Sequence, residues 1–122
     1  MTNFIKGRFQ SFRYALKGFY LLLTTEHSII AQSIFFSLLI ILGFYMGISK
    51  QDWINQTLGM GLVLSVEGLN TSVEKLADFT HKDHHPKIGF IKDVAAGAVT
   101  FAAFTFLTII LITYFPYFLN HA

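Results

Sequence analysis

Two long stretches of this sequence contain no charged residue. They cover residues 28–49 and 94–122 and consist mainly of aliphatic and aromatic side chains. A helix over the first stretch extends roughly 33 Å, enough to cross the hydrocarbon core of a bilayer. Only 13% of the chain is charged, against about a quarter in soluble domains. The sequence therefore predicts an integral membrane protein.

A shorter apolar stretch lies between these two. Residues 53–66 are uncharged, but a helix of that length would by itself suit a buried core helix better than a crossing. It reaches the length of a crossing only if it continues through Glu67 and Glu74. We therefore predict an all-α membrane protein with a single domain over residues 1–122 and crossings at 28–48, 53–77 and 93–119.

Lysine and arginine are unevenly distributed along the chain. Four lie in the N-terminal segment and four between residues 75 and 92, whereas the first loop holds only Lys50 and the C-terminal tail holds none. Basic residues gather on the cytoplasmic side of a membrane protein, and three crossings place both basic segments on that side. The N-terminus is therefore predicted inside the cell and the C-terminus outside.

Residues 4–25 precede the first predicted crossing and have the pattern of an amphipathic surface helix. Apolar side chains recur at helical spacing from Ile5 to Leu23, while Lys6, Arg13 and Lys17 lie on a separate polar stripe. Such a helix lies in the headgroup region with its apolar face toward the acyl chains. Simple anchoring to anionic lipid is sufficient to explain this pattern.

The second predicted crossing ends in a stripe of acidic residues. Glu67, Glu74 and Asp78 are spaced by seven and four residues, and on a helix they share one face with Asn70. A carboxylate at membrane depth is costly and usually faces a protein interior or a polar cavity. Three acids with an amide are therefore more typical of a functional site than of a structural device.

Further acids and lysines are predicted on the same side of the membrane. Glu26 precedes the first crossing, Asp93 precedes the third, and Lys17 and Lys92 accompany them. Carboxylates suit Mg²⁺, which is held by few protein oxygens together with waters and phosphates. Phosphoryl transfer needs such a metal, cations for the phosphates and a carboxylate that accepts a proton. The same acids equally suit a proton relay in a transporter, and the residue types leave both open.

Several common signatures are absent from the sequence. There is neither a GxxxxGK[ST] loop nor a GxGxxG motif, and no cysteine is present to form a disulfide or a thiolate zinc site. The net charge of +2 is too small to indicate nucleic-acid binding. The tract of His81, His84 and His85 is more typical of solvated loop residues than of a metal site.

Residues 67–78 read EGLNTSVEKLAD and resemble the signature of prokaryotic diacylglycerol kinases, E-x-[LIVM]-N-[ST]-[SA]-[LIV]-E-x-x-V-D. Eleven of the twelve positions agree, and Ala77 replaces the usual valine. Residues 12–18 and 92–99 also resemble segments of that family, so the likeness covers nearly the whole chain. It implies a homotrimer of three-span subunits in the bacterial inner membrane, with active sites at subunit interfaces on the cytoplasmic side.

The resemblance implies an ATP- and Mg²⁺-dependent lipid kinase. The expected acceptor is the hydroxyl of diacylglycerol, which gives phosphatidic acid. Undecaprenol kinases share this scaffold and these residues, so undecaprenol is the alternative acceptor. From other functional classes, a small proton-coupled transporter subunit and a non-catalytic membrane interaction module remain alternatives.

The resemblance also implies a role for each candidate residue. Glu67 is the expected general base, and Glu26 and Glu74 are the expected Mg²⁺ ligands. Asn70 is expected to order the site beside Glu67. The residues expected to contact ATP are Tyr14, Lys17, Glu26, Glu74, His85, Lys92 and Asp93. The segment around Glu26 departs from the common family pattern, because Thr25 replaces an asparagine and no arginine follows.

Overall fold

The chain folds into helices alone within residues 1–121, the part that the computed structural model describes. There are four of them in this part: α1 (Thr2–Thr25), α2 (His27–Met46), α3 (Lys50–Thr80) and α4 (Pro86–His121). The prediction of an all-α protein is therefore confirmed.

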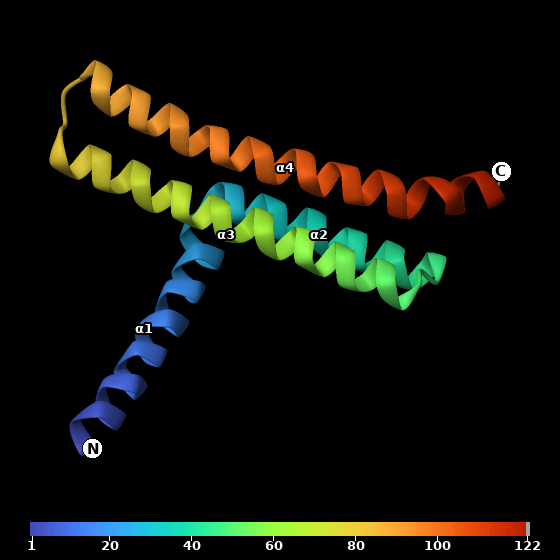
Figure 1. Cartoon of the computed structure of the whole chain (residues 1–122), viewed down its shortest axis with the longest axis horizontal. Coiled ribbons are helices and arrows are strands. Elements are labelled where there is room, and N and C mark those ends of the chain that lie inside the picture. Colours follow the sequence, from blue (N-terminus) through green and yellow to red (C-terminus); the bar gives the residue numbers. More distant parts are fainter. Residues whose placement is uncertain (122) are drawn as a thin grey trace.

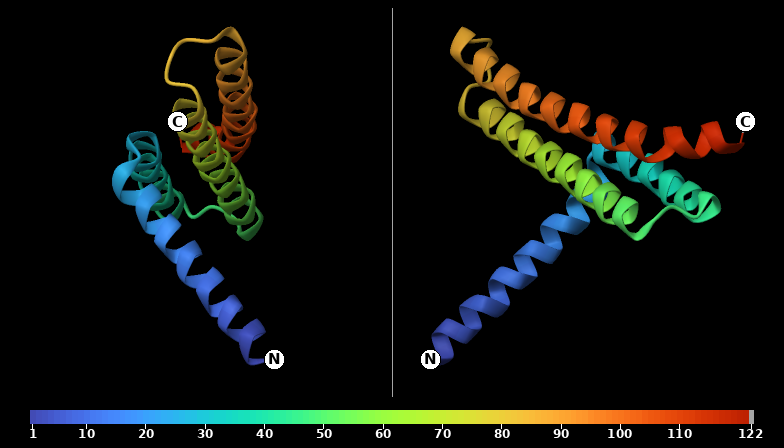
Figure 2. Two further views of the ribbon diagram at one scale, coloured as in Figure 1. Left: turned by 90° about the vertical axis from the view of Figure 1, so that its left-hand side faces the viewer. Right: turned by 45° about the vertical axis from the view of Figure 1, so that its right-hand side comes forward.

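Helices α2, α3 and α4 lie side by side in alternating directions, while α1 points away from them (Figures 1 and 2). No residue of α1 is buried. The chain changes direction at Glu26, whose extended backbone, with φ −96° and ψ 109°, ends α1 and begins α2. Helix α1 is thus an arm attached to a three-helix unit.

A tight turn joins α2 to α3. Gly47 has a φ of 63°, a left-handed conformation that glycine adopts without strain, and it ends α2. Ser49 then caps α3, since its side chain accepts from the backbone N–H of Asp52 and the Asp52 carboxylate accepts from the backbone N–H of Ser49. This reciprocal cap fixes where α3 begins and returns the chain alongside α2.

The apolar core lies among α2, α3 and α4. Phe36 of α2 and Phe106 of α4 are both buried, with ring centroids 4.8 Å apart. Gly59 of α3 lies beside this pair, because a Cβ added there would sit only 2.9 Å from Phe106 Cδ2. The missing side chain at Gly59 thus lets α4 approach α3 closely.

A buried polar cluster joins the same three helices. The Tyr114 hydroxyl of α4 lies 2.6 Å from Gln56 Oε1 of α3 and 3.1 Å from the carbonyl oxygen of Leu39 in α2. Gln56 is completely buried, and Tyr114 is 3% exposed. Gln56 Nε2 has no partner in the described chain, but the contacts of the Tyr114 hydroxyl reach both other helices and so favour one arrangement of the three.

Large apolar side chains cover the outside of the helical unit. Phe44 of α2 is 74% exposed and Phe101 of α4 is 79% exposed. Among the described helices, His27–Met46 and Pro86–Asn120 are long and apolar enough to cross a membrane, each with a mean hydropathy of 2.2. Helix α3, which contains the predicted crossing 53–77, is not apolar enough to join them. The third crossing therefore stays a prediction.

Candidate active site

The acidic stripe of α3 lies on the half of this helix that leads into the loop at residues 81–85 (Figure 1). Glu67 and Asn70 are each 9% exposed, whereas Asp78 is exposed. The C-terminal part of α1 approaches α3 here, because a Cβ at Gly68 would lie 3.2 Å from Leu22 Cδ1. The stripe therefore starts in a covered position and ends at the surface.

Glu67 is the most enclosed acid of the stripe. Neither of the two ion pairs within residues 1–121 involves it. No lysine or arginine within these residues therefore holds its carboxylate, which leaves that carboxylate free to receive the proton of a hydroxyl. Glu67 thus has the surroundings that a general base needs.

Asn70 and Glu74 form a pair one helical turn further along α3. Asn70 Nδ2 donates to Glu74 Oε1 over 3.2 Å, which orients that carboxylate and leaves its second oxygen available. The Asn70 Oδ1 atom is buried and has no hydrogen-bond partner in the described chain. A buried acceptor without a partner is rare in folded proteins, so this atom is available to a ligand or to water.

Glu26 is brought to α3 by the bend between α1 and α2. Its Oε1 atom lies 3.3 Å from Lys75 Nζ and 3.3 Å from Thr25 Oγ1. The Glu26 side chain is 19% exposed and that of Lys75 is 69% exposed. Since Lys75 follows Glu74 directly, the ion pair places Glu26 next to the turn of α3 that carries the second expected metal ligand.

Lys92 of α4 is paired with Asp78 of α3 by an ion pair that is also a hydrogen bond. This contact bridges the two helices near the loop that connects them. Asp93, the next residue of α4, is exposed. Lys92 therefore lies at the same end of the helical unit as Glu74, with its charge balanced by Asp78 rather than by Glu26 or Glu74.

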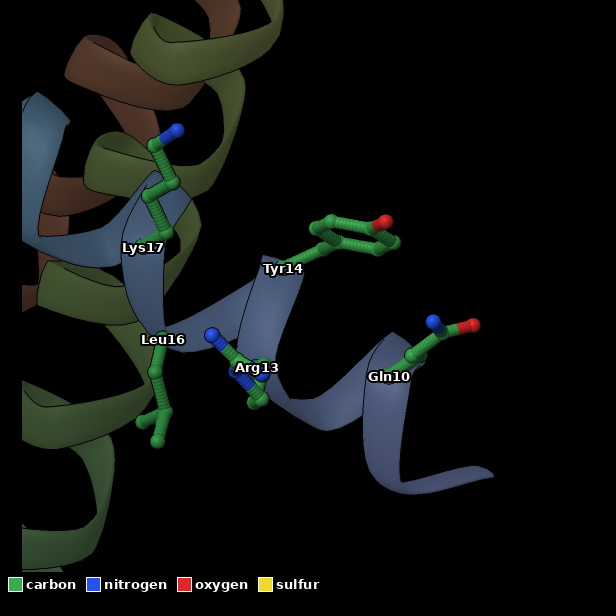
Figure 3. Close-up of a pocket in the computed structure, with 5 residues that line it drawn as sticks. All are labelled: Gln10, Arg13, Tyr14, Leu16 and Lys17. Atoms are coloured by element: carbon green, nitrogen blue, oxygen red, sulfur yellow. The ribbon is translucent and has the colours of Figure 1, made fainter. Parts of the chain in front are cut away.

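Tyr14 and Lys17 lie on α1, a different helix from the acidic stripe. Together with Gln10, Arg13 and Leu16 they line a hollow of about 410 Å³ on this helix (Figure 3). Tyr14 is 70% exposed and points away from α3, whereas Lys17 points toward the helical unit (Figure 3). Within this single chain, the structure does not bring Tyr14 together with the acids of α3.

His85 caps the N-terminus of α4. Its Nδ1 atom accepts a hydrogen bond of 3.1 Å from the backbone N–H of Lys87, which satisfies one of the free N–H groups of the first turn. The His81 ring lies beside it, with centroids 5.2 Å apart. The Nε2 atom of His85 stays available, so its expected contact with nucleotide remains a prediction.

The carboxylates do not form a preassembled metal cage. Within residues 1–121, no group of three or more His, Asp or Glu side chains is placed to hold a metal ion. Glu26 and Glu74 nevertheless fit Mg²⁺, because each has one oxygen that is not taken by Lys75 or Asn70. Mg²⁺ commonly binds one or two protein carboxylates and completes its shell with waters and substrate phosphates.

Sequence reasoning missed two contacts of this site. The residue patterns did not pair Lys75 with Glu26, nor Asp78 with Lys92, because helical spacing relates only residues of one helix. The only sequence signal for these ion pairs was that the lysines and the acids are predicted on the same, cytoplasmic side of the membrane. The three-dimensional arrangement thus adds the counter-ions that the acidic stripe alone did not identify.

Comparison with known proteins identifies the family of this chain. Residues 13–114 match the prokaryotic diacylglycerol kinase family. The chain is also 32% identical over 114 residues to the undecaprenol kinase of Bacillus subtilis (strain 168), and the aligned region covers 93% of each chain. These matches decide against the transporter and the interaction module as alternative classes. The chain belongs to the prokaryotic diacylglycerol kinase family, and it is a membrane phosphotransferase that uses a nucleotide to phosphorylate a lipid alcohol.

Proposed function

We propose that this protein transfers the γ-phosphate of ATP, with Mg²⁺, to the hydroxyl of undecaprenol. The similarity to an undecaprenol kinase over most of both chains supports this acceptor. Diacylglycerol, the acceptor expected first from the sequence, is the second candidate because the family carries its name. Both lipids present a hydroxyl above long apolar chains, so the same catalytic groups serve either.

The observation that carries the proposal is the setting of Glu67. Its side chain is nearly buried at the end of an apolar helix segment, one turn from the Asn70–Glu74 pair. A lipid that enters sideways from the bilayer brings its hydroxyl to this depth, so the membrane confines one substrate to the plane of the site. Glu67 is therefore our candidate for the general base.

The reaction follows from these groups. Glu67 takes the proton of the lipid hydroxyl while that oxygen forms a bond to the γ-phosphorus and the bond to the ADP oxygen breaks. Lys92 leaves its ion pair with Asp78 and binds the phosphates instead. Asn70 keeps Glu74 oriented. Mg²⁺, held by Glu26 and Glu74, would supply positive charge to the transferring group.

We also propose how the chain sits in the membrane. Helices α2, α3 and α4 each cross the bilayer once, and α1 lies on its cytoplasmic surface. The exposed phenylalanines of α2 and α4 suit contact with lipid. The uneven distribution of lysine and arginine supports the cytoplasmic position of the N-terminus and of the site, in the inner membrane of a bacterium.

The nucleotide-binding side requires more than one chain in this proposal. Tyr14 is 70% exposed on an arm that leaves the helical unit. An ATP molecule bound by Tyr14 would therefore need a second chain to supply the other contacts. A homotrimer with active sites between subunits supplies that second chain. Tyr14, Lys17, His85 and Asp93 are then the remaining candidates for contacts with ATP.

The test is transfer of labelled γ-phosphate from Mg·ATP by the purified protein in mixed micelles, with undecaprenol and diacylglycerol assayed in parallel. We expect label in undecaprenol at the higher kcat/KM and no label without Mg²⁺. A higher kcat/KM for diacylglycerol would replace the proposed acceptor by the second candidate. Absence of transfer to either lipid would overturn both.

A further inference from the structure

We propose that Lys75 is an exchangeable counter-ion. It neutralises Glu26 in the empty site, and it binds the phosphates of ATP once Mg²⁺ has replaced it at the Glu26 carboxylate. The inference deepens the proposed function, since it rests on the Mg²⁺ role proposed for Glu26. Its starting point is the ion pair of 3.3 Å between Lys75 Nζ and Glu26 Oε1.

Lys75 is the principal donor to Glu26. Thr25 Oγ1 also lies 3.3 Å from the same carboxylate oxygen, but it lies only 2.7 Å from the carbonyl oxygen of Leu21. A hydroxyl carries one proton, and the shorter and better-placed contact takes it. The charge of Glu26 is therefore balanced mainly by the ammonium group of Lys75.

The two partners differ in how firmly they are held. Glu26 is 19% exposed, so its charge needs a counter-ion when no metal is bound. Lys75 is 69% exposed, and an ion pair with so much solvent on one side contributes little to stability. Lysine also carries its charge on a flexible four-carbon stem. Glu26 thus requires a cation, while Lys75 exchanges its partner at little cost.

Space for the exchange lies beside the pair. Glu26 and Lys75 both line a hollow of about 570 Å³ between α1 and α3, which also has the side chains of Leu22 and Thr71 on its wall. The ammonium group can therefore move from the carboxylate to an incoming anion without leaving this hollow. The phosphates that accompany Mg²⁺ are the anions that arrive there under the proposed function.

Charge arithmetic gives the direction of the exchange. A divalent cation on Glu26 repels a lysine ammonium at the same carboxylate, and the nucleotide phosphates bound to that cation attract it. Lys75 therefore competes with the metal when nucleotide is absent, but assists when nucleotide is present. A residue that only positions Glu26 would assist the metal in both cases.

The experiment separates these two roles by replacing Lys75 with methionine, which keeps the length of the side chain and removes its charge. Binding of Mn²⁺ without nucleotide is measured by electron paramagnetic resonance, and binding of a fluorescent ATP analogue with Mn²⁺ is measured separately. We expect Lys75→Met to tighten Mn²⁺ binding about two- to fivefold and to weaken binding of the nucleotide about tenfold. Lys75→Arg should stay within about twofold of the wild type in both titrations.

Lys50→Met is the matched control, because it removes a lysine from the other end of the same helix. Both titrations should be unchanged in this variant. Weaker Mn²⁺ binding in Lys75→Met would overturn the exchange in favour of simple positioning, and unchanged nucleotide binding would remove the phosphate contact. Unchanged Mn²⁺ affinity in Glu26→Gln would also overturn the proposed exchange. The lipid phosphorylation assay tests the proposed function separately.

Discussion

The two ends of the three-helix unit are held together by different chemistry. At the end near the α2–α3 turn, hydrogen bonds without a lysine partner join the helices: Tyr114 contacts Gln56 and the Leu39 carbonyl. The Tyr117 hydroxyl accepts from the backbone N–H of Ser49 over 3.2 Å and donates to Asp52 Oδ2 over 3.3 Å. We call this the turn end. At the other end, named the carboxylate end, the cross-helix contacts are the ion pairs Glu26–Lys75 and Asp78–Lys92.

This difference separates stability from function along one molecule. The bonds of Tyr114 are buried and have no competing water, so they fix the geometry of the helices. The ion pairs of the carboxylate end have exposed members, so they are weak and exchange partners easily. Under the proposed mechanism this combination is useful, because Mg²⁺ would replace Lys75 at Glu26 and the phosphates would replace Asp78 at Lys92.

Glu67→Gln provides the strongest test of this contrast. An amide cannot take the proton of the lipid hydroxyl, and general-base catalysis contributes about 10²–10⁴-fold to a rate. We expect kcat to fall about 10³-fold, measured by label transfer in micelles, with the thermal stability of the protein unchanged. More than about a tenth of the wild-type activity in this variant would contradict the proposed role of Glu67.

Glu74→Gln should act on the metal rather than on the chemical step. The amide keeps one oxygen but loses the negative charge that is proposed to bind Mg²⁺. We expect the Mg²⁺ concentration for half-maximal activity to rise about 30-fold, with most of kcat recovered at saturating Mg²⁺. Asp83→Asn, a change in the loop after α3, serves as the control and should leave this concentration unaltered. An unchanged Mg²⁺ requirement in Glu74→Gln would remove Glu74 from the metal role.

Much of the fold was predictable because its signals are local. Charge-free stretches predicted two helices, and the spacing of Glu67, Asn70 and Glu74 placed them on one face of a third. The contacts between helices were not predictable. The pairing of Gln56 with Tyr114 joins residues 58 positions apart, and no periodicity relates such residues. The placement of Tyr14 away from α3 has the same origin, since the bend at Glu26 sets it.

The site was predictable to a similar extent. The signature over residues 67–78 gave the family, which the comparisons confirm. The role of each acid and lysine remains a prediction, because roles depend on partners from other helices and from ligands. Around Glu26, where the sequence departs from the common pattern, Lys75 is the principal donor that the structure supplies.

Gly59→Ala tests how closely the helices are packed between the two ends. The new Cβ would lie 2.9 Å from Phe106 Cδ2 and 3.0 Å from Ile109 Cδ1, and a phenylalanine ring packed against Phe36 has little freedom to move. We expect a loss of about 2 kcal/mol in unfolding free energy, measured by thermal denaturation in detergent. Gly89→Ala is the control, because nothing lies within 4 Å of that Cβ position. Equal stability of the two variants would show that α3 and α4 are packed more loosely.

Tyr114→Phe tests the claim that the turn end serves stability alone. Removing the hydroxyl leaves Gln56 Oε1 without its donor, and a buried hydrogen bond of this kind contributes about 1 kcal/mol. Tyr117→Phe is the matched control, because Asp52 keeps the Ser49 hydroxyl as a donor at 2.8 Å, so its loss should stay below about 0.5 kcal/mol. Both variants should keep the wild-type kcat, since Gln56 lies roughly 16 Å along α3 from Glu67. A fall in kcat for Tyr114→Phe without a loss of stability would mean that the two ends are coupled through α3.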